Sequence, residues 1–428
     1  MKRLWPVLLI VALLVACAPL PAAAPPSAAP ATGGTAEEGV VTLRFAIWDA
    51  NQVEMQQKAI DLFEAQHPNI KIKMEVLGGD TYWPKILAML AGQDAYDLFW
   101  MDTYNFLDYA SRNAMLDLTP YIERDKVNMA DLYGAGRMVN VTYEDKVYAV
   151  PKDSDDPALY YNKDLFDKYG VEYPTADWTW DDLQTKAAAL THPEDEVWGF
   201  STGQFFGGPD WWNWVWQNGG EILTPDGKTV LLDQPAACDA LKWWYGLAQA
   251  GYAPDGNIIQ SADPTEQLFP TGKVAMLMYG QWMLSVFAKL PFNLGVAPLP
   301  AGPGGKAVQL GGLAYTAWSG TPHPDEAWEF VKFMGGDEAM KIQAESGVII
   351  PALVSQQSVW AESLPNLDLK GAFLDMMPYG KRPGFVGWEW NNEVNKVLTD
   401  AWSGNLSIDQ ACVAATEAGN AALAKRSQ

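Results

Sequence analysis

The sequence predicts an α/β fold, and three observations early in the chain lead to this prediction. Apolar and polar residues alternate over 41–47 and again over 70–76, as they do in half-buried strands. Stretches with helical spacing follow each of them, and a buried-looking apolar run spans 98–101. Strand, helix, strand, helix and strand in this order favour a parallel sheet. The 428 residues exceed the roughly 250–300 at which one hydrophobic core stops growing, so we expect two domains.

The two helices of this first region are indicated by the spacing of their apolar residues. Met55, Ala59 and Phe63 recur every four residues, which places them on one helical face. The pair His67-Pro68 ends this helix, because proline restricts the residue before it to extended or turn geometry. Residues 86–90 show the same helical spacing and predict the second helix.

The later elements follow from breaks in the pattern. The turn-rich segment 151–157 precedes a strand-like segment at 158–162, and this change suits a hinge. Residues 180–182 open a helix, and 298–306 form a second break rich in Pro and Gly. A further helix spans 324–334, with proline in its first turn and acidic residues near its positive end. The remainder is expected to be mostly helical.

The chain starts with the pattern of an export leader. Lys2 and Arg3 supply a positive start, and the apolar stretch 4–16 is too short to span a bilayer. Small residues then precede Cys17, so that residues 1–17 resemble the bacterial lipoprotein signal. The resemblance implies that Cys17 becomes the first mature residue, carries lipid and holds an extracytoplasmic protein at the membrane surface. The alternative is an ordinary signal peptide with an incidental cysteine.

Composition adds to this expectation. Residues 18–40 are mostly Ala, Pro, Ser, Thr and Gly, which predicts a spacer without a core. The formal net charge is −23, and such a surface rejects nucleic acid and is repelled by anionic lipid. Because the sequence has no second apolar run long enough to span a bilayer, the lipid on Cys17 is the expected membrane attachment.

The cysteines and histidines do not predict a metal site. Cys238 and Cys412 lie in Ala-rich, helix-like segments, where they either pair in an oxidising compartment or remain small buried thiols. His67, His192 and His323 each precede a proline and mark the ends of elements. Neither HExxH nor CxxC spacing occurs, so we expect no metal and no cofactor.

Five segments in order carry a family resemblance. Together they resemble the extracellular solute-binding proteins of ABC importers, in the large sugar-binding family that includes maltodextrin-binding protein. The resemblance runs from Val41 nearly to the C-terminus, and its carriers are residues 43–49, 97–102, 160–166, 272–282 and 311–313.

The resemblance implies two α/β lobes that are joined by segments crossing more than once and that close on a ligand. We expect 41–152 with 301–336 in the first lobe, and 153–300 with 337–428 in the second. It further implies a monomer that captures a mono- or oligosaccharide outside the cytoplasm and passes it to the importer's permease without catalysis.

The expected ligand residues suit a sugar, which has flat C–H faces and a rim of hydroxyl groups. Tryptophan offers a broad rigid plate, carboxylates accept hydroxyl protons, and the chain contains 20 Trp. Some candidates follow predicted strands, where α/β sheets bind ligands, and others match positions of ligand contacts in the family. The candidates are Trp48, Asp49, Trp100, Asp102, Asp153, Trp211, Trp212, Tyr279, Trp282, Gly311, Gly312, Trp388, Glu389 and Trp390.

Several candidates have a structural alternative. Trp100 lies inside an apolar strand and suits the core, while Asp49 and Asp102 suit N-caps of the helices that follow them. Only one of Trp211 and Trp212 is expected to face the cleft. Asp155 and Asp156 compete with Asp153 for the polar contact at the hinge.

Other functions are compatible with parts of the sequence. Tryptophan boxes also bind quaternary ammonium groups, so a cationic solute is the alternative ligand, which would need an enclosing cage in place of parallel plates. A glycosidase also combines aromatic plates with paired carboxylates, but the sequence specifies no such pair. Residues 199–203 fit GxSxG, yet the only downstream histidine, His323, stands between two prolines.

Overall fold

The computed structural model describes residues 39–202, 209–382 and 387–426. By its internal contacts the chain divides into two units, residues 1–40 and 41–428, and the fold given below is that of the second unit. Cys17 and most of the predicted spacer lie outside the described residues. Among the helices that the structure describes, none has the length and apolar character that a membrane span needs.

The first sheet has five strands, and its first three follow the sequence prediction. β1 runs parallel to both β2 and β3, with Val41 opposite Ile70 and Phe45 opposite Leu98. β13 comes from much later in the chain and lies antiparallel between β3 and β6, with Leu313 opposite Asp102. The order is β2-β1-β3-β13-β6, with bounds β1 Val41–Ile47, β2 Ile70–Val76, β3 Leu98–Asp102, β13 Leu313–Ala317 and β6 Ala149–Pro151.

Helices on this sheet bury the faces that the apolar spacing predicts. α1 (Val53–Gln66) buries Met55, Ala59 and Phe63 and ends before Pro68, and α2 spans Gly79–Ala91. α13 (Pro324–Met334) has proline in its first turn and acidic residues near its N-terminus, as predicted. The core under these helices contains Phe45, Phe63 and Phe330, whose rings pack edge to face. We call this sheet with its helices the first body.

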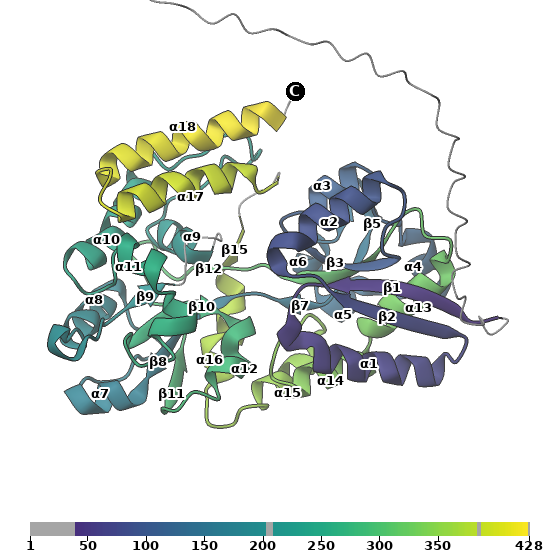
Figure 1. Ribbon diagram of the computed structural model, residues 1–428, viewed down its shortest axis with the longest axis horizontal. Helices are drawn as coiled ribbons and strands as arrows, with labels where there is room; N and C mark the ends of the chain where they lie inside the picture. The colour runs from purple at the N-terminus through teal and green to yellow at the C-terminus, as the bar shows by residue number, and fades with distance from the viewer. Residues whose placement is uncertain (1–38, 203–208, 383–386, 427–428) are drawn as a thin grey trace, which may run out of the picture. The chain divides into compact units, whose positions relative to one another are not determined.

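A second sheet of four strands forms the centre of the second body. β8 (Pro157–Asn162) lies antiparallel to β10 (Met276–Gly280) and to β11 (Leu294–Ala297), and β9 (Ser201–Thr202) is parallel to β10. The strand predicted at 158–162 is confirmed. Figure 1 shows the second body at the left and the first body at the right, with the sheet of each among its helices.

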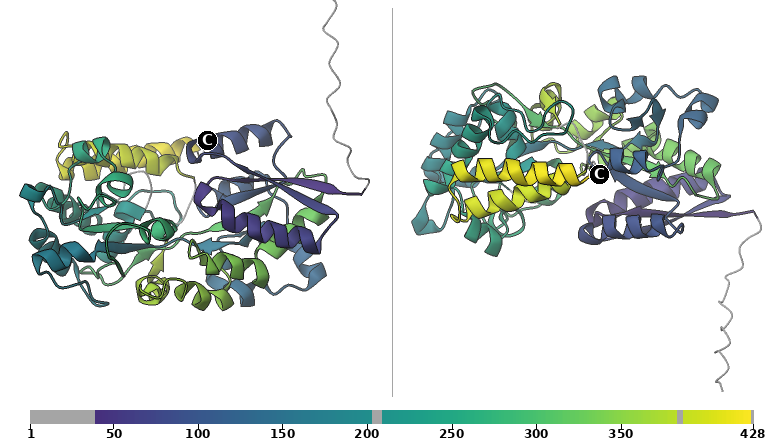
Figure 2. Two further views of the ribbon diagram at one scale, coloured as in Figure 1. Left: turned by 60° about the horizontal axis from the view of Figure 1, so that its bottom comes forward. Right: turned by 90° about the horizontal axis from the view of Figure 1, so that it is seen from above.

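The tryptophan-rich core of the second body lies between this sheet and the five helices α8, α9, α10, α17 and α18. α8 (Trp180–Ala189) begins at the predicted residue, with a capping box between Thr179 and Asp182. α17 (Glu389–Trp402) and α18 (Ile408–Arg426) run side by side, as both views of Figure 2 show, and α18 contacts α10 (Pro235–Gln249). α9 (Pro209–Gln217) carries the cluster of tryptophans at 211–216.

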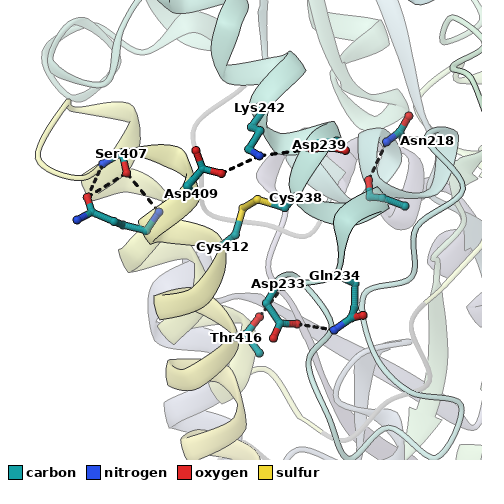
Figure 3. Close-up of a disulfide and its surroundings, with 12 residues drawn as sticks. Asn218, Asp233, Gln234, Cys238, Asp239, Lys242, Ser407, Asp409, Cys412 and Thr416 are labelled. Carbon is teal, nitrogen blue, oxygen red and sulfur yellow. Dashed lines mark hydrogen bonds and ion pairs between the residues drawn. A yellow bond between two sulfur atoms is a disulfide. The ribbon is translucent and has the colours of Figure 1, made fainter.

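A disulfide joins Cys238 in α10 to Cys412 in α18, which decides between the two alternatives that the sequence leaves open (Figure 3). The Cα atoms are 5.7 Å apart, within the range that a disulfide requires. The ion pair between Lys242 and Asp409, 2.7 Å long, lies beside it on the same two helices. The C-terminal helix is therefore fixed to the second body both covalently and by charge.

The chain crosses between the two bodies more than once. It leaves the first sheet through β7 (Asp153–Ser154), which pairs with β14 (Ile350–Pro351), and it returns through residues 310–312 into β13. Ala307 and Val308 pack in the core of the second body, whereas Ala339 and Met340 pack in the core of the first body. The lobe boundaries expected at 300/301 and 336/337 remain a prediction.

The remaining elements are short or connect those described above. They are η1 Ala50–Gln52, α3 Phe106–Ser111, α4 Thr119–Asp125, α5 Met129–Tyr133, α6 Ala135–Met138, β4 Thr142–Tyr143, β5 Lys146–Val147, α7 Lys163–Tyr169, η2 Pro193–Asp195, α11 Gly256–Ser261, η3 Pro264–Leu268, η4 Gln281–Met283, α12 Leu284–Phe287, β12 Val308–Gln309, α14 Asp337–Glu345, η5 Val354–Gln356, α15 Gln357–Ala361, α16 Leu369–Ala372, η6 Leu374–Tyr379 and β15 Gly380–Lys381.

Candidate ligand-binding site

Two predicted tryptophans belong to the first sheet: Trp48 directly follows β1, and Trp100 lies within β3. The ring of Trp48 is half-buried, and its centroid lies 5.1 Å from the Trp100 ring at a right angle and 4.8 Å from Tyr82. Trp100 itself is 0% exposed in the middle of β3. In this structure Trp100 packs as a core residue and supports Trp48, so that only Trp48 presents accessible surface.

The two predicted carboxylates at the strand ends are engaged by the loops that follow them. Asp49 accepts hydrogen bonds from the backbone N–H of Asn51 at 2.9 Å and from the side chain of Gln52 at 3.0 Å. Asp102, 8% exposed, accepts from the backbone N–H groups of Tyr104 and Asn105 at 2.9 and 2.6 Å. Burial raises the pKa of Asp102 to about 6 in spite of these donors. Asp49 is thus the N-cap of η1, as its structural alternative predicts, whereas the N-cap of α3 is Asn105 and Asp102 binds the loop before that helix.

A buried lysine joins the strand ends to the crossing segment. Lys152 Nζ donates to Gln52 Oε1 at 2.7 Å and to Asp153 Oδ2 at 2.5 Å, and it lies 4.6 Å from the centroid of the Trp100 ring. The other oxygen of Asp153 accepts the backbone N–H of Leu313 at 2.7 Å. Asp153 therefore stabilises the point where the chain changes bodies. Sequence reasoning missed Lys152, because the partners of a buried charge are not visible in the local pattern.

Aromatic rings from both bodies meet beside the end of β3. Tyr104, from the loop after β3, has its ring centroid 4.6 Å from Trp388 and 6.0 Å from Trp212. The Trp212 ring lies nearly parallel to the Trp390 ring, with a centroid distance of 6.2 Å and an interplanar angle of 10°. It also stacks on Trp388, with a centroid distance of 5.9 Å and an interplanar angle of 29°. Trp212 and Trp390 are buried, whereas Trp388 is half-buried. The predicted Trp212, Trp388 and Trp390 thus form one cluster, and Tyr104 is an unpredicted member of it.

The remaining predicted aromatic and acidic residues are Trp211, Tyr279, Trp282 and Glu389. Trp211 is buried and donates its Nε1 hydrogen to Asn395 Oδ1 at 2.9 Å, which favours a structural role for it. The half-buried ring of Trp282 lies against Gly280, where no Cβ would fit, with its centroid 5.5 Å from Tyr279. Glu389 is exposed at the start of α17.

The two predicted glycines lie where the backbone comes close to other groups. Gly312 has φ +153°, and a Cβ there would meet the backbone carbonyl of Asp153. A Cβ on Gly311 would lie 2.9 Å from Tyr104 Oη and 3.1 Å from Gln309 Nε2. The backbone of Gly311 pairs with Asp155, whose carboxyl pKa is raised well above its usual value by burial and by the charge of Asp153.

The structure therefore gathers one set of candidates and separates another. Asp102, Trp212, Gly311 and Trp388 lie around Tyr104, whose pKa is raised by burial and by the charges of Asp155 and Asp102, and Trp390 stacks on Trp212. A second set, Trp48, Asp49 and Trp100, is linked to Asp153 through Gln52 and Lys152. Tyr104, Gln281 and Gln309 were not among the predicted contacts, and Asp155 was expected only as an alternative to Asp153. Tyr104 lies in the loop after β3, Gln281 in η4 and Gln309 in β12, and local sequence patterns do not distinguish these positions.

The serine of the GxSxG pattern does not lie where that motif requires it. Ser201 of the GxSxG pattern lies in β9 rather than at a turn between a strand and a helix, and its Oγ donates to the carbonyl of Thr202 at 2.8 Å. Gly203 falls outside the described residues. Within the described part of the chain, His, Cys, Asp and Glu side chains form no group of three suited to a metal ion.

Two α/β bodies, several crossing segments and an aromatic and acidic site at the crossings together define a class of two-lobed binding proteins. The chain matches the family of bacterial extracellular solute-binding proteins over residues 49–341, and it belongs to that family. The predicted family and the predicted two-lobed α/β fold are thereby confirmed. The family assignment also places the protein among extracytoplasmic binding proteins.

Individual relatives support the same assignment. A protein of Brucella abortus described as a binding protein is 26% identical over 367 residues, which cover 84% of this chain and 87% of that protein. The melibiose/raffinose/stachyose-binding protein of Bacillus subtilis is 25% identical over 311 residues, or 68% of each chain. The solved structure of an ABC substrate-binding protein of Listeria monocytogenes in complex with cycloalternan has a TM-score of 0.84 at 26% identity, and the match covers 90% of this chain and 99% of that one.

Proposed function

We propose that this protein captures a mono- or oligosaccharide outside the cytoplasm and delivers it to the permease of an ABC importer. The observation that carries the proposal is the cluster of Tyr104, Trp212 and Trp388, which joins aromatic rings of both bodies beside the buried carboxyl group of Asp102. The relatives named above that bind saccharides support it, as does membership of the family.

The chemistry of the cluster suits a sugar ring. The half-buried rings of Tyr104 and Trp388 offer apolar surface against which the C–H faces of a sugar can stack. Carboxyl and amide oxygens, such as those of the hydrogen-bonded side chains Asp155 and Gln281, can accept hydrogen bonds from hydroxyl groups. Sugar binding needs both kinds of contact, because aromatic surface alone does not orient the ring.

Ligand binding favours closure of the two bodies, because the ligand contacts residues of both. Tyr104 belongs to the first body, whereas Trp212 and Trp388 belong to the second, so a sugar held between them contacts both. A ligand that binds the closed arrangement more tightly than the open one shifts the population toward closure. The permease would then recognise the closed form.

A thermal-shift screen tests the choice of ligand class. Residues 40–428 are heated with maltotriose, raffinose, mannotriose, spermidine or glycine betaine. Binding to the folded form alone stabilises the protein by about 2.7 kcal/mol at a hundredfold excess over Kd, so the melting temperature rises. A shift with a sugar that is recovered unchanged supports the proposal. A shift only with spermidine or betaine would assign a cationic solute, and a cleaved sugar would indicate a glycosidase.

A matched pair of variants tests the site. Trp388→Ala should weaken binding of the sugar found in the screen by about tenfold or more, because it removes a stacking surface. Trp243→Ala is the control: Trp243 is also half-buried and stacked, on Trp180 at 4.0 Å, but it lies on α10 away from the cluster. Equal affinities of the two variants would contradict the assignment of the site.

The proposed tether concerns Cys17. We propose that this residue carries lipid and holds the mature protein, as a monomer, at the outer face of a membrane. In a bacterial host, Cys17→Ala should release the full-length protein from the membrane fraction and abolish its labelling with a palmitate analogue. Labelled, membrane-bound Cys17→Ala protein would overturn this part of the proposal.

A further inference from the structure

Two buried glutamines beside the aromatic cluster each have an oxygen without a partner. Gln281 and Gln309 are both 1% exposed. The Oε1 atom of each is buried and has no hydrogen-bond partner among the described residues. A buried carbonyl oxygen left unpaired is unfavourable and uncommon in native proteins, so its position calls for a physical explanation.

The amide group of Gln281 is hydrogen-bonded to the side chain of Asp155. Gln281 follows β10, and its Nε2 donates to Asp155 Oδ1 at 3.3 Å. Because Nε2 is engaged in this hydrogen bond, Oε1 is the end of the amide that stays available. Gln281 is also anchored through its backbone N–H, which donates to the carbonyl of Asp156.

Gln309 is held on the other side of the same crossing. It lies in β12, and its backbone N–H donates to Asn213 Oδ1 at 2.7 Å. Its Nε2 lies 3.1 Å from the position that a Cβ on Gly311 would occupy, and Tyr104 Oη lies 2.9 Å from that same position. Because residue 311 is glycine, the phenol of Tyr104 and the amide of Gln309 can approach this point of the backbone.

The backbone pairing places these groups on one face. Gly311 and Asp155 exchange two hydrogen bonds, N–H to carbonyl, at 2.8 and 3.3 Å. Residues directly opposite each other in an antiparallel pair direct their Cβ atoms to the same side. The Asp155 carboxyl group therefore lies on the side where Tyr104 Oη and the Gln309 amide meet, and Gln281 is bound to that carboxyl group.

We propose that Gln281 and Gln309 are specificity-determining residues whose amide oxygens each accept a hydrogen bond from a hydroxyl group of the bound saccharide. This inference rests on the proposed function and specifies its chemistry. The sugar ring that stacks at Tyr104 and Trp388 presents two hydroxyl donors toward the Asp155–Gly311 pair. A buried acceptor rejects a ligand that lacks the matching donor, because the acceptor then stays unpaired.

The test measures affinity and discrimination together by calorimetric titration. The tightest sugar among maltotriose, raffinose and mannotriose is compared with its set of monodeoxy derivatives. Wild-type protein should bind at least two of these derivatives about tenfold or more weakly than the parent sugar. This measurement needs no variant, so it tests the proposal even where a substitution prevents folding.

Variants then assign each hydroxyl group to its acceptor. Gln309→Met and Gln281→Met keep the side-chain length but remove the amide. Each variant should bind the parent sugar about tenfold more weakly than wild-type protein does. Each should also bind one of the two derivatives with the same affinity as it binds the parent sugar. The control is Gln356→Met: Gln356 is buried, its Nε2 donates to Asp337 at 2.7 Å and its Oε1 is also unpartnered among the described residues, but it lies in η5. Its affinity should stay within about twofold of wild type.

Each outcome is decisive. If the Met variants lose affinity equally for the parent and every derivative, the two glutamines are structural and the proposal is wrong. It is also wrong if wild-type protein binds all monodeoxy derivatives as tightly as the parent. If wild-type protein binds none of the three sugars but binds spermidine or glycine betaine, the proposed saccharide function fails first, and the inference fails with it.

Discussion

A single buried cation illustrates how the site depends on contacts between distant residues. Lys152 is 0% exposed, and its ammonium group contacts Gln52, Asp153 and the Trp100 ring. Lysine is almost never fully buried unless it is paired. Its partner Gln52 is 100 residues away in the chain, so neither the charge pair nor its place at the crossing could be predicted from local spacing.

Loss of Lys152 should be costly for a specific reason. Lys152→Met leaves the Asp153 carboxylate buried without its partner, and we expect a loss of about 3–5 kcal/mol in the free energy of unfolding. The double variant with Asp153→Asn removes the unpaired charge and should recover part of this loss. Denaturant unfolding of both variants measures the difference. A single variant as stable as the double variant would contradict the ion pair described here.

The carboxyl group of Asp102 gives a pH dependence of stability with a definite sign. Its pKa is raised from an ordinary 3.8 to about 6, so the folded protein holds this proton more tightly than the unfolded chain. Stability from this group is complete below about pH 4 and is lost as the pH rises to about 6. Relative to Asp102→Asn, wild-type protein should lose up to about 3 kcal/mol across this range.

Denaturant unfolding of wild type and Asp102→Asn between about pH 4 and about pH 7 checks this prediction. The Asn side chain retains an oxygen that can accept the backbone N–H groups of Tyr104 and Asn105. A free-energy difference that does not change with pH would show that Asp102 titrates normally in the folded protein.

Among the site residues, the sequence predicted those that follow clear local signals. Trp48 and Asp49 follow a strand that alternation reveals, and Asp102 follows the apolar run at 98–101. Trp212, Trp388 and Trp390 were expected from the family resemblance. Tyr104, Gln281 and Gln309 were missed, and Asp155 was expected only as an alternative to Asp153, because these residues meet only through the pairing of residues 155 and 311. Whether the predicted residues contact a ligand remains a prediction.

At the scale of elements, local patterns predicted the first three strands and their helices. β1, α1, β2, α2 and β3 follow one another in the chain, and their apolar spacing records which face each one buries. The position of β13 between β3 and β6 was not predicted, because it pairs with residues more than 160 positions earlier in the chain. The mixed strand order of the second sheet was not predicted for the same reason.

The disulfide between α10 and α18 yields a prediction at this scale. It closes a loop across 174 residues and fixes the C-terminal helix to the second body. Replacing Cys238 and Cys412 by Ala should reduce the free energy of unfolding by about 2–5 kcal/mol, because the unfolded chain is no longer constrained. Thermal unfolding measures the loss, and wild-type protein reduced with dithiothreitol is the matched control. An unchanged melting temperature in both samples would contradict the pairing.

At the scale of the whole molecule, sugar capture predicts a change in the population of open and closed forms. The site draws Tyr104 from the first body and Trp388 from the second, so a bound sugar favours their approach. Small-angle scattering of residues 40–428 should show a smaller radius of gyration when the sugar is present at saturation. Trp388→Ala at the same sugar concentration should show less compaction. An identical radius of gyration with and without bound sugar would contradict coupling between binding and closure.

The most direct measurement is a calorimetric titration of residues 40–428 with maltotriose, raffinose and mannotriose, followed by mass spectrometry of the recovered sugar. We expect saturable binding of at least one sugar to a single site per chain, with the sugar recovered unchanged and with affinity reduced by Trp388→Ala. Absence of binding to all three, together with binding of spermidine or glycine betaine, would contradict saccharide capture.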